Sequence, residues 1–522
     1  MNPHADFRLK KRISSILLPM LLVGVSSIGA IAAVAADDEA ASLIGGPMVG
    51  HTTAESVRIW ARSTKPAELV VAVATKADLS DAVKSRPVRL EAENDLAGVA
   101  EVTGLRPATT YHYQVRIDGK DALEAPLPTF RTFPAEGKPA KVRVLFGGGI
   151  RFQADPEQKL WDHMLDKQPT AMLMMGDQIY PDNPIAAEYV HDVIERVGLG
   201  GTEKLLIRDR QTIVEGADRV TRQADAYSGG PRGTRFLFHR AYYRMQQALP
   251  TYARFVARVP SYAVWDDHDA FHDGRGGANL PMELRKESLR VFRENFANPY
   301  FGGGDEHPGT WCHFSLADLD FFLLDARTYR ENRGPKERRF MGEEEERWLK
   351  ERLKASTAKI KFLVCGSPWN NQPKTGAKLT EENYYDTTGD TLASYKWQRD
   401  QLLEWIIENR IPNVVLLSGD RHRGEVVEVW PKGKRDMVFH DLNNCNIGSR
   451  THGPAGEVGE DGLIYVFSGR CYGLLDIDTT SDPATIAYEI WGQRNERQPV
   501  EKQYRFVLRT TDFLPERVPD GD

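Results

Sequence analysis

The pattern of apolar and polar positions changes character once along the chain, near residue 134. Between residues 43 and 134 it favours strands, because apolar and polar residues alternate in 56–60 and 110–117 and residues 69–73 form one apolar run. Residues 134–139 contain two prolines and a glycine, which is typical of a linker. Beyond the linker, short apolar runs alternate with helical patterns. The pattern therefore predicts an all-β domain followed by a layered α/β domain.

The α/β region contains six short apolar runs that we interpret as strands: 142–146, 171–175, 262–265, 321–324, 360–364 and 414–417. Helical patterns lie between them at 156–167, 239–256, 282–296, 343–355 and 395–409. A long polar insertion, residues 183–233, interrupts this alternation. It is either a lid or substrate-facing arm, or a surface elaboration of the domain.

The first domain carries a turn-and-strand motif at residues 104–113. This stretch resembles the signature of fibronectin type III domains, in which a tyrosine hydroxyl ties down a strand corner. Tyr111 is the candidate for that tyrosine. We therefore expect a fibronectin-III-like β-sandwich over residues 43–134.

Length and composition narrow the class of protein. A chain of 522 residues is expected to hold two or three domains. The net charge of −6 is close to balance for this length, so no nucleic-acid-binding surface is indicated. The four cysteines include no C-x-x-C pair, which excludes a zinc knuckle. They form either disulfides, in any of three complete pairings, or buried free thiols.

The N-terminus has the order of a secretory signal. A basic segment at residues 10–12 precedes an apolar stretch, and Ala33-Val34-Ala35 offers a small-x-small cleavage site. We interpret residues 1–35 as a signal peptide, which predicts an exported protein located in the periplasm, outside the cell or at the cell surface. The alternative is an uncleaved membrane anchor, since the apolar stretch is long enough to span a bilayer. The export route stays open, and no later segment is expected to cross a membrane.

Aspartates follow four of the predicted strands. Asp177, Asp267, Asp325 and Asp420 each come within a few residues of a strand end, with histidine, tyrosine or arginine close by. Ligands of open α/β sheets bind at the carboxyl ends of strands, so we expect these side chains to converge. Taken singly, each aspartate is more typical of a turn or a helix cap.

Carboxylates with a few imidazoles suit Ca²⁺, Mn²⁺, Fe³⁺ or catalytic Zn²⁺. Two or more cations would offset the repulsion among clustered aspartates. Arginines near the same strand ends are able to bind phosphate in bidentate fashion, although each alone is more typical of a surface charge. These are Arg151, Arg327, Arg421 and Arg423. Metals and arginines together favour displacement at phosphorus.

The motifs around these aspartates resemble those of calcineurin-type metallophosphoesterases. They are Gly176-Asp177, residues 265–269 (W-D-D-H-D) and residues 419–422 (G-D-R-H). Tyr180, residues 324–330 and the N-terminal sandwich are similar to one branch, the alkaline phosphatase D (PhoD-like) family, and the resemblance covers residues 43–478.

The resemblance implies a catalytic domain of four layers, α/β/β/α, which we place at residues 140–490, followed by a C-terminal extension at 491–522. It also implies a secreted phosphomonoesterase or phosphodiesterase that uses metal-activated oxygen attack. The sequence does not decide between the two activities.

The resemblance also implies roles for individual residues. The metal ligands are Asp177 as the bridging ligand, Tyr180 as a ferric phenolate, Asp267, Asp420 and His422. His268 would orient the scissile phosphate or protonate the leaving group. We assign Arg327 and Arg421 to catalysis, and Arg151, Arg423 and Asn444 to substrate binding. Two further residues after the W-D-D-H-D motif, His272 and Asp273, are either additional support for the site or plain loop residues.

The first ligand loop departs from the family pattern. Gly149 stands where the family has a cysteine ligand. The resemblance implies Ca²⁺ and Fe³⁺, but this glycine leaves the ferric site open, with Zn²⁺ or Mn²⁺ as alternatives. The loss also motivates a second hypothesis, a catalytically lapsed cell-surface binding protein that retains the fold. A third is a metallohydrolase that acts on a substrate other than a phosphate ester.

Overall fold

The structure is a computed structural model that describes residues 40–181, 234–271, 274, 276–332, 337–370, 392–449, 455–460 and 462–513. Contacts divide the chain into two units, Met1–Ala40 and Ala41–Asp522, and every element named below belongs to the second. The predicted signal peptide, the insertion at 183–233, and His272 and Asp273 lie outside the described residues. The domain boundaries therefore stay predictions.

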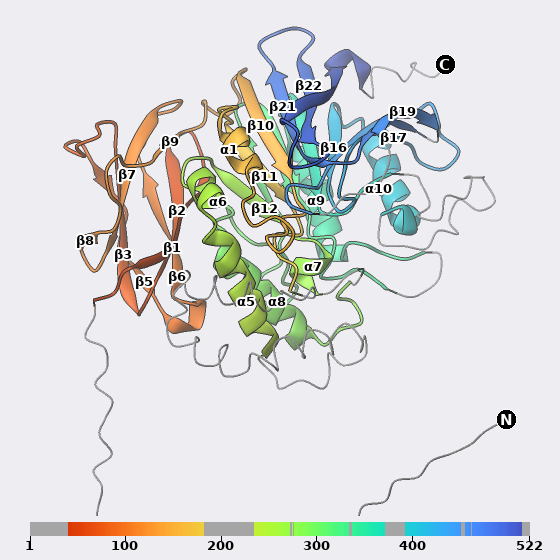
Figure 1. Ribbon diagram of the computed structural model, residues 1–522. Coiled ribbons are helices and arrows are strands. Elements are labelled where there is room, and N and C mark those ends of the chain that lie inside the picture. Colours follow the sequence, from red (N-terminus) through yellow and green to blue (C-terminus); the bar gives the residue numbers. More distant parts are fainter. Residues whose placement is uncertain are drawn as a thin grey trace, which may run out of the picture. The chain divides into compact units, whose positions relative to one another are not determined.

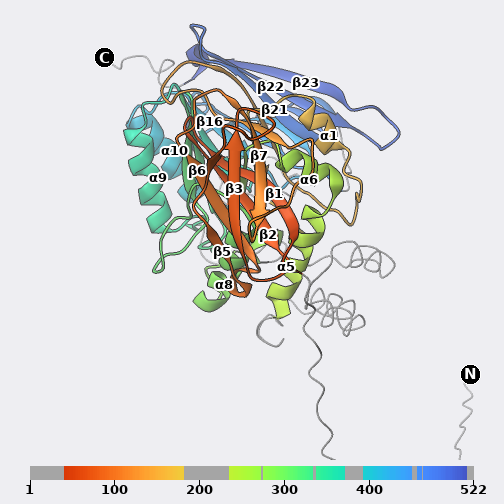
Figure 2. The ribbon, with the colours of Figure 1, turned by 90° about the vertical axis from the view of Figure 1, so that its left-hand side faces the viewer.

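The N-terminal part is a β-sandwich, as the alternating pattern predicted. One sheet has the order β1 (Leu43–Thr52), β2 (Ser56–Ser63), β6 (Ala97–Thr103). The other has the order β4 (Val83–Lys84), β3 (Ala67–Ala74), β7 (Thr110–Ile117), β8 (Lys120–Asp121), with β5 (Val88–Leu90) and β9 (Thr129–Arg131) pairing β3 and β7. Figure 2 looks onto these strands. Tyr111 confirms its predicted role, because its hydroxyl accepts the Arg106 backbone N–H at 2.8 Å.

The next part is built on a mixed six-stranded sheet. Its order is β12 (Ser261–Val264), β11 (Ala171–Met175), β10 (Lys141–Gly147), β21 (Arg470–Asp478), β22 (Thr485–Gln493), β23 (Glu501–Arg509). The pairs β10–β11 and β11–β12 are parallel, and the remaining pairs are antiparallel. Four helices pack on one face through an apolar cluster that includes Trp161, Met174 and Phe255. They are α1 (Leu160–Leu165), α5 (Thr234–Gln247), α6 (Pro250–Val256) and α8 (Met282–Asn295).

A second mixed sheet has eight strands. Its order is β13 (Cys312–Leu316), β14 (Leu319–Leu323), β15 (Ile360–Cys365), β16 (Val414–Ser418), β18 (Phe439–Asn444), β17 (Gly424–Val429), β20 (Leu463–Phe467), β19 (Ala455–Glu460). Its outer face packs on α9 (Glu343–Ala355) and α10 (Lys396–Glu408). Its inner face shares an apolar cluster with the six-stranded sheet, including Phe146, Phe362 and Leu417. The predicted α/β/β/α arrangement is thereby confirmed (Figure 1).

Several details differ from the pattern-based expectation. The single helix expected at 239–256 is two helices, because Pro250 begins α6 and has no N–H to continue α5. Strands β22 and β23 carry the six-stranded sheet past residue 490, into the segment set apart as a C-terminal extension. All four cysteines are buried free thiols. Within the described part of the chain, no helix combines the length and apolar character needed to cross a bilayer.

Candidate metal centre

The carboxyl ends of strands from both sheets meet at one point, and glycines make this approach achievable. A Cβ on Gly176 would lie 2.6 Å from the Cβ of Asp266, and one on Gly419 would lie 2.3 Å from the Met175 carbonyl oxygen. A Cβ on Gly366 would lie 2.9 Å from the Asp266 Cβ. Real Cβ atoms do not tolerate such distances. The glycine of each G-D motif therefore allows the backbones to touch, and the following aspartate is placed at the junction.

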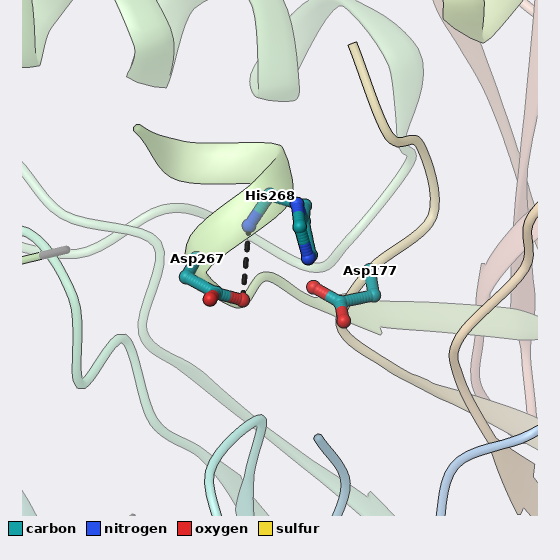
Figure 3. Close-up of side chains that lie close together, drawn as sticks. All are labelled: Asp177, Asp267 and His268. Carbon is teal, nitrogen blue, oxygen red and sulfur yellow. Dashed lines mark hydrogen bonds between the residues drawn. The ribbon is translucent and has the colours of Figure 1, made fainter. Parts of the chain in front are cut away.

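Carboxylates and one imidazole converge at this junction. The ligand atoms of Asp177, Asp267 and His268 all lie within 4.8 Å of one another, and the same holds for Asp266, Asp267 and Asp420. Asp177 follows β11, while Asp267 and His268 begin the short helix α7 (Asp267–Ala270). Figure 3 shows the three side chains of the first group directed toward one another. The predicted convergence of strand-end aspartates is present, and we call Asp177, Asp266, Asp267 and Asp420 the acidic cluster.

Three residues of the site have backbone angles that residues other than glycine seldom adopt. The φ values are +55° at Asp177, +70° at Asp420 and +51° at His422. Left-handed conformations cost energy for residues with a Cβ, so the surrounding structure must hold them. Such strain concentrates at functional sites, where it aims a side chain at a fixed point.

Asp177 is almost fully enclosed within the acidic cluster, at 1% exposure. Its Oδ2 accepts the Tyr180 hydroxyl at 3.0 Å and lies 3.8 Å from Nε2 of His422. The Tyr180 oxygen is also 2.8 Å from that imidazole nitrogen. The other oxygen, Oδ1, is buried and has no hydrogen-bond partner. An unpartnered buried oxygen costs about 1–3 kcal/mol, so this atom is suited to a cation.

The pKa values reflect the crowding of acids. Burial would raise the pKa of Asp177, but the charges of His268, His422 and Arg327 and a hydrogen bond from His422 lower it overall. Burial, followed by the charge of Asp177, raises the pKa of the Tyr180 phenol well above its ordinary value. Tyr180 is therefore a neutral phenol in the protein alone. Its conversion to a phenolate ligand requires a nearby positive charge.

Two aspartates of the same motifs have structural roles instead. Asp269 accepts backbone N–H groups of Gln178 at 2.8 Å and Asp266 at 3.1 Å, and so fixes the turn that carries Asp177. Asp325 accepts the Trp265 indole N–H at 3.0 Å and the Thr310 backbone N–H at 2.7 Å. The fourth strand-end aspartate thus lies beside the acidic cluster without joining it. Its neighbour Arg327 makes the connection.

Arg327 lies beneath the acidic cluster and is fully buried. Its Nε donates to Asp266 Oδ1 at 2.5 Å, and its Nη2 donates to Ser367 Oγ at 3.1 Å and lies 3.9 Å from Asp267 Oδ1. These contacts favour a positioning role, in which the guanidinium holds Asp266 and Asp267, over the predicted contact with substrate.

The other arginines lie nearer the surface. Arg421 and Arg423 occupy the turn between β16 and β17, at 4.0 Å and 2.5 Å from the buried carboxylate of Glu425. Nη1 of Arg421 is buried without a hydrogen-bond partner. The guanidinium of Arg151 lies 5.6 Å above the ring of Tyr180. Arg151 therefore lies beside Tyr180, and Arg421 stands between Asp420 and His422 in the sequence, while contact of either arginine with substrate stays a prediction.

Asn444 has different surroundings from those expected. Its side chain is fully buried, and its Nδ2 contacts the Tyr488 hydroxyl at 3.4 Å, in the six-stranded sheet. The preceding Asn443 instead donates to Ser418 Oγ and to the Gly419 carbonyl, at 2.8 Å and 2.6 Å. Side chains alternate along β18, so these two asparagines face opposite sides. The structure does not join Asn444 to the acidic cluster.

Sequence reasoning did not assign Cys445, which follows β18. Its Sγ lies 3.3 Å from the position of a Cβ on Gly149, and the ring of His422 lies 3.4 Å from that position. Burial raises the pKa of the Cys445 thiol, and the charges of Asp177, Asp420 and Asp266 add to this effect. The sequence did contain one indication of a functional role, because Cys445 directly follows the polar end of β18. Its proximity to the first loop could not be seen in the sequence.

The residues present fit a bound cation. The donor set consists of carboxylates, two imidazoles and the Tyr180 phenol, and negative groups outnumber the buried guanidinium of Arg327. The unpartnered Oδ1 of Asp177 supports the same conclusion. Clustered acids of this kind are stabilised by metal ions, whose charge is absent from the amino-acid sequence.

Comparison with known proteins gives a consistent result. The family model described as PhoD-like phosphatase matches residues 148–455, and the model of the PhoD-like phosphatase N-terminal domain matches residues 30–134. Alkaline phosphatase D of Bacillus subtilis (strain 168) is 22% identical over 352 residues, which cover 62% of this chain. The match spans about half (52%) of the Bacillus protein.

Solved structures agree on the fold. A structure of PhoD matches with a TM-score of 0.67 and 16% identity, over 89% of both chains. A purple acid phosphatase from yellow lupin (Lupinus luteus) seeds matches with a TM-score of 0.55 and 11% identity, over 89% of this chain and 74% of the other. At these identities the matches show the fold alone.

Proposed function

This chain belongs to the PhoD-like phosphatase family, and we propose that it is an exported, metal-dependent phosphoesterase. The observation that carries the proposal is the acidic cluster at the meeting point of both sheets, together with the buried and unpartnered Oδ1 of Asp177. Solvent alone does not compensate acids that are buried to this extent. A site of this kind is expected to hold cations.

Each candidate ligand has a place in this proposal. Asp177, Tyr180 and His422 lie in mutual contact and would hold one cation, while Asp267 and Asp420 would hold the next. When bound, cations at such a site supply Lewis acidity that activates an attacking oxygen and offsets charge on the phosphoryl group. Carboxylates favour Ca²⁺ or Mn²⁺, whereas a phenolate favours Fe³⁺.

The remaining side chains would act on the substrate. The His268 ring lies 4.3 Å from the Tyr180 ring, is partly exposed, and is suited to orient the ester or protonate its leaving oxygen. Arg421 has a buried nitrogen without a partner and would bind phosphoryl oxygens, together with Arg151. Arg423 is held by Glu425 at the rim of the same turn.

The test combines metal analysis with turnover. The purified chain is analysed for metals by mass spectrometry, and hydrolysis of p-nitrophenyl phosphate and bis-p-nitrophenyl phosphate is measured with and without chelator. We expect bound metal and chelator-sensitive hydrolysis, with the preferred ester deciding between monoesterase and diesterase. Metal-free protein that stays inactive after Ca²⁺, Fe³⁺, Mn²⁺ and Zn²⁺ are added would instead support the lapsed binding protein. Bound metal without hydrolysis of either ester would favour a metallohydrolase of another substrate class.

A further inference from the structure

The loop after β18 runs alongside the loop after β10, although the two are almost 300 residues apart in the sequence. The N–H groups of Ile447 and Gly448 donate to the carbonyl oxygens of Gly148 and Gly149, at 3.0 Å and 3.1 Å. Cys445 enters this pairing from the end of β18. Gly149 has no side chain, which leaves room for the Cys445 sulfur. A Cβ at position 149 would lie only 3.3 Å from that sulfur.

The Cys445 sulfur is buried and lies in a strongly charged environment. The residue is fully buried, and the carboxylates of Asp177, Asp420 and Asp266 all act on its thiol. The Tyr180 phenol is also within electrostatic range of it. The backbone N–H of Asp420 donates to the sulfur.

Another buried cysteine provides a contrast. Cys312 in β13 belongs to the apolar cluster between the sheets, and its sulfur accepts the Asn298 amide at 3.7 Å. A thiol in an apolar core is a packing group. The Cys445 thiol instead lies within electrostatic range of three carboxylates, and a second atom points independently to a cation at this place. Asp177 is 1% exposed, and its Oδ1 lacks a partner.

We propose that Cys445 is a metal ligand, which completes from β18 the cation site that Asp177 and Tyr180 form from β11. The proposal rests on the metal-dependent function above and adds a ligand that the strand-end motifs do not contain. Binding would release the thiol proton to solvent and leave a thiolate on the cation. Thiolate and phenolate together select a transition metal such as Fe³⁺, Co²⁺ or Zn²⁺ over Ca²⁺. The more open Asp267–Asp420 side would remain an all-oxygen site.

The test uses the full chain, stripped of metal and titrated with Co²⁺. A thiolate bound to Co²⁺ absorbs in the near ultraviolet through sulfur-to-metal charge transfer, and ligands without sulfur lack this band. We expect the band to grow with Co²⁺ and saturate in the native sequence. Cys445→Ser should lose at least nine-tenths of its intensity while one oxygen-ligated cation still binds. The matched control Cys312→Ser, also a buried cysteine, should keep it.

Three results would overturn the inference in distinguishable ways. Saturable Co²⁺ binding without the band, or a band retained in Cys445→Ser, would remove Cys445 from the site and leave the phosphoesterase proposal intact. Absence of binding by Co²⁺ and every other cation offered would remove both proposals. If Cys445→Ser does not fold, the decisive measurement is zinc-edge X-ray absorption of the native protein. A sulfur neighbour at about 2.3 Å supports the inference, and a shell of only nitrogen and oxygen contradicts it.

Discussion

Two buried groups of charged residues in this protein are built in opposite ways. The first, which we call the seam network, joins the β-sandwich to helices α5 and α8. It consists of Arg62, Asp95, Arg240, Arg244 and Glu294. Arg62 Nη2 lies 3.0 Å from Asp95 Oδ2 and donates to Asn295 Oδ1 at 2.9 Å, and Nη1 donates to Gln247 Oε1 at 2.9 Å. Arginines outnumber acids within the network, and each acid contacts at least one arginine.

Among the described residues of the acidic cluster, the ratio is reversed, and acids outnumber arginines. Four carboxylates converge there, and the buried Arg327 pairs with Asp266 and lies near Asp267. Asp177 keeps one oxygen without a partner. Both groups are removed from water, so the different charge ratios indicate different purposes. The seam network stabilises the protein by itself, whereas the acidic cluster depends on a charge supplied from outside.

The sharpest test of this contrast removes the Asp177 charge. Asp177→Asn should lower hydrolysis of the preferred ester on the order of 10³-fold, or about 4 kcal/mol of transition-state stabilisation, because a bridging ligand would be lost. Bound metal should fall in parallel, and the melting temperature of the chelator-treated protein should change little. Steady-state kinetics and metal analysis on the same preparation measure both. Full activity in Asp177→Asn would show that the acidic cluster is not the reaction centre.

The complementary change removes an acid from the seam network. Asp95→Asn should destabilise the protein by about 3 kcal/mol, because it leaves the buried Arg62 guanidinium short of a counter-charge. Asparagine tolerates the left-handed backbone at this position, φ +56°, so the loss reports charge rather than strain. Urea unfolding measures stability, and metal content per folded molecule should equal that of the native sequence. A loss of metal in Asp95→Asn would contradict the proposed division of roles.

The sequence predicts best those features that are local. Alternation placed β7, and the G-D spacing placed Asp177 and Asp420 at strand ends, since both follow from the geometry of one strand. The seam network was not predicted, because its arginines lie in β2 and α5 and its acids lie elsewhere in the chain. No periodic pattern relates residues that meet only after two domains have packed.

The same distinction explains why two residues of the candidate site have surroundings that differ from those expected. Arg327 and Asn444 were chosen because they lie next to strand ends in the sequence. Arg327 in fact points beneath the acidic cluster, and Asn444 points between the sheets. Proximity in sequence fixes the position of a Cα but not the direction of the side chain. Cys445 shows the converse, since its relation to Gly149 depends on a contact between two sheets.

Another titratable group, the half-buried His51, lies where β1 meets β12, and it has no acidic partner among its named contacts. Its Nδ1 is 3.3 Å from the Tyr262 hydroxyl, and burial, with the charges of Arg58 and His313, lowers its pKa to about 4. A lowered histidine pKa means that folding favours the neutral ring. This contribution is fully present above the unfolded pKa near 6.5 and is lost as pH falls from there toward 4.

We expect His51→Gln to remove about 2–3 kcal/mol of the stability difference between pH 7 and pH 4. Unfolding of both proteins at each pH isolates the effect, because the carboxylates titrate equally in the two. An identical pH dependence in the variant and the native protein would show that His51 is not protonated on unfolding.

The smallest expected change in stability also distinguishes the acidic cluster from the seam network, because it should have the opposite sign in metal-free protein. Asp420 lies in the acidic cluster with φ +70°, a conformation that asparagine tolerates. In metal-free protein, Asp420→Asn should raise stability by about 1 kcal/mol, because it relieves repulsion from Asp266 and Asp267. With Mn²⁺ present the same change should lower stability, because a ligand is lost. Melting temperatures with chelator and with Mn²⁺ give both signs, and Asp95→Asn, the seam control, should be destabilising in either condition. If Asp420→Asn destabilises the metal-free protein as well, the acidic cluster is compensated from within the chain, and the contrast with the seam network disappears.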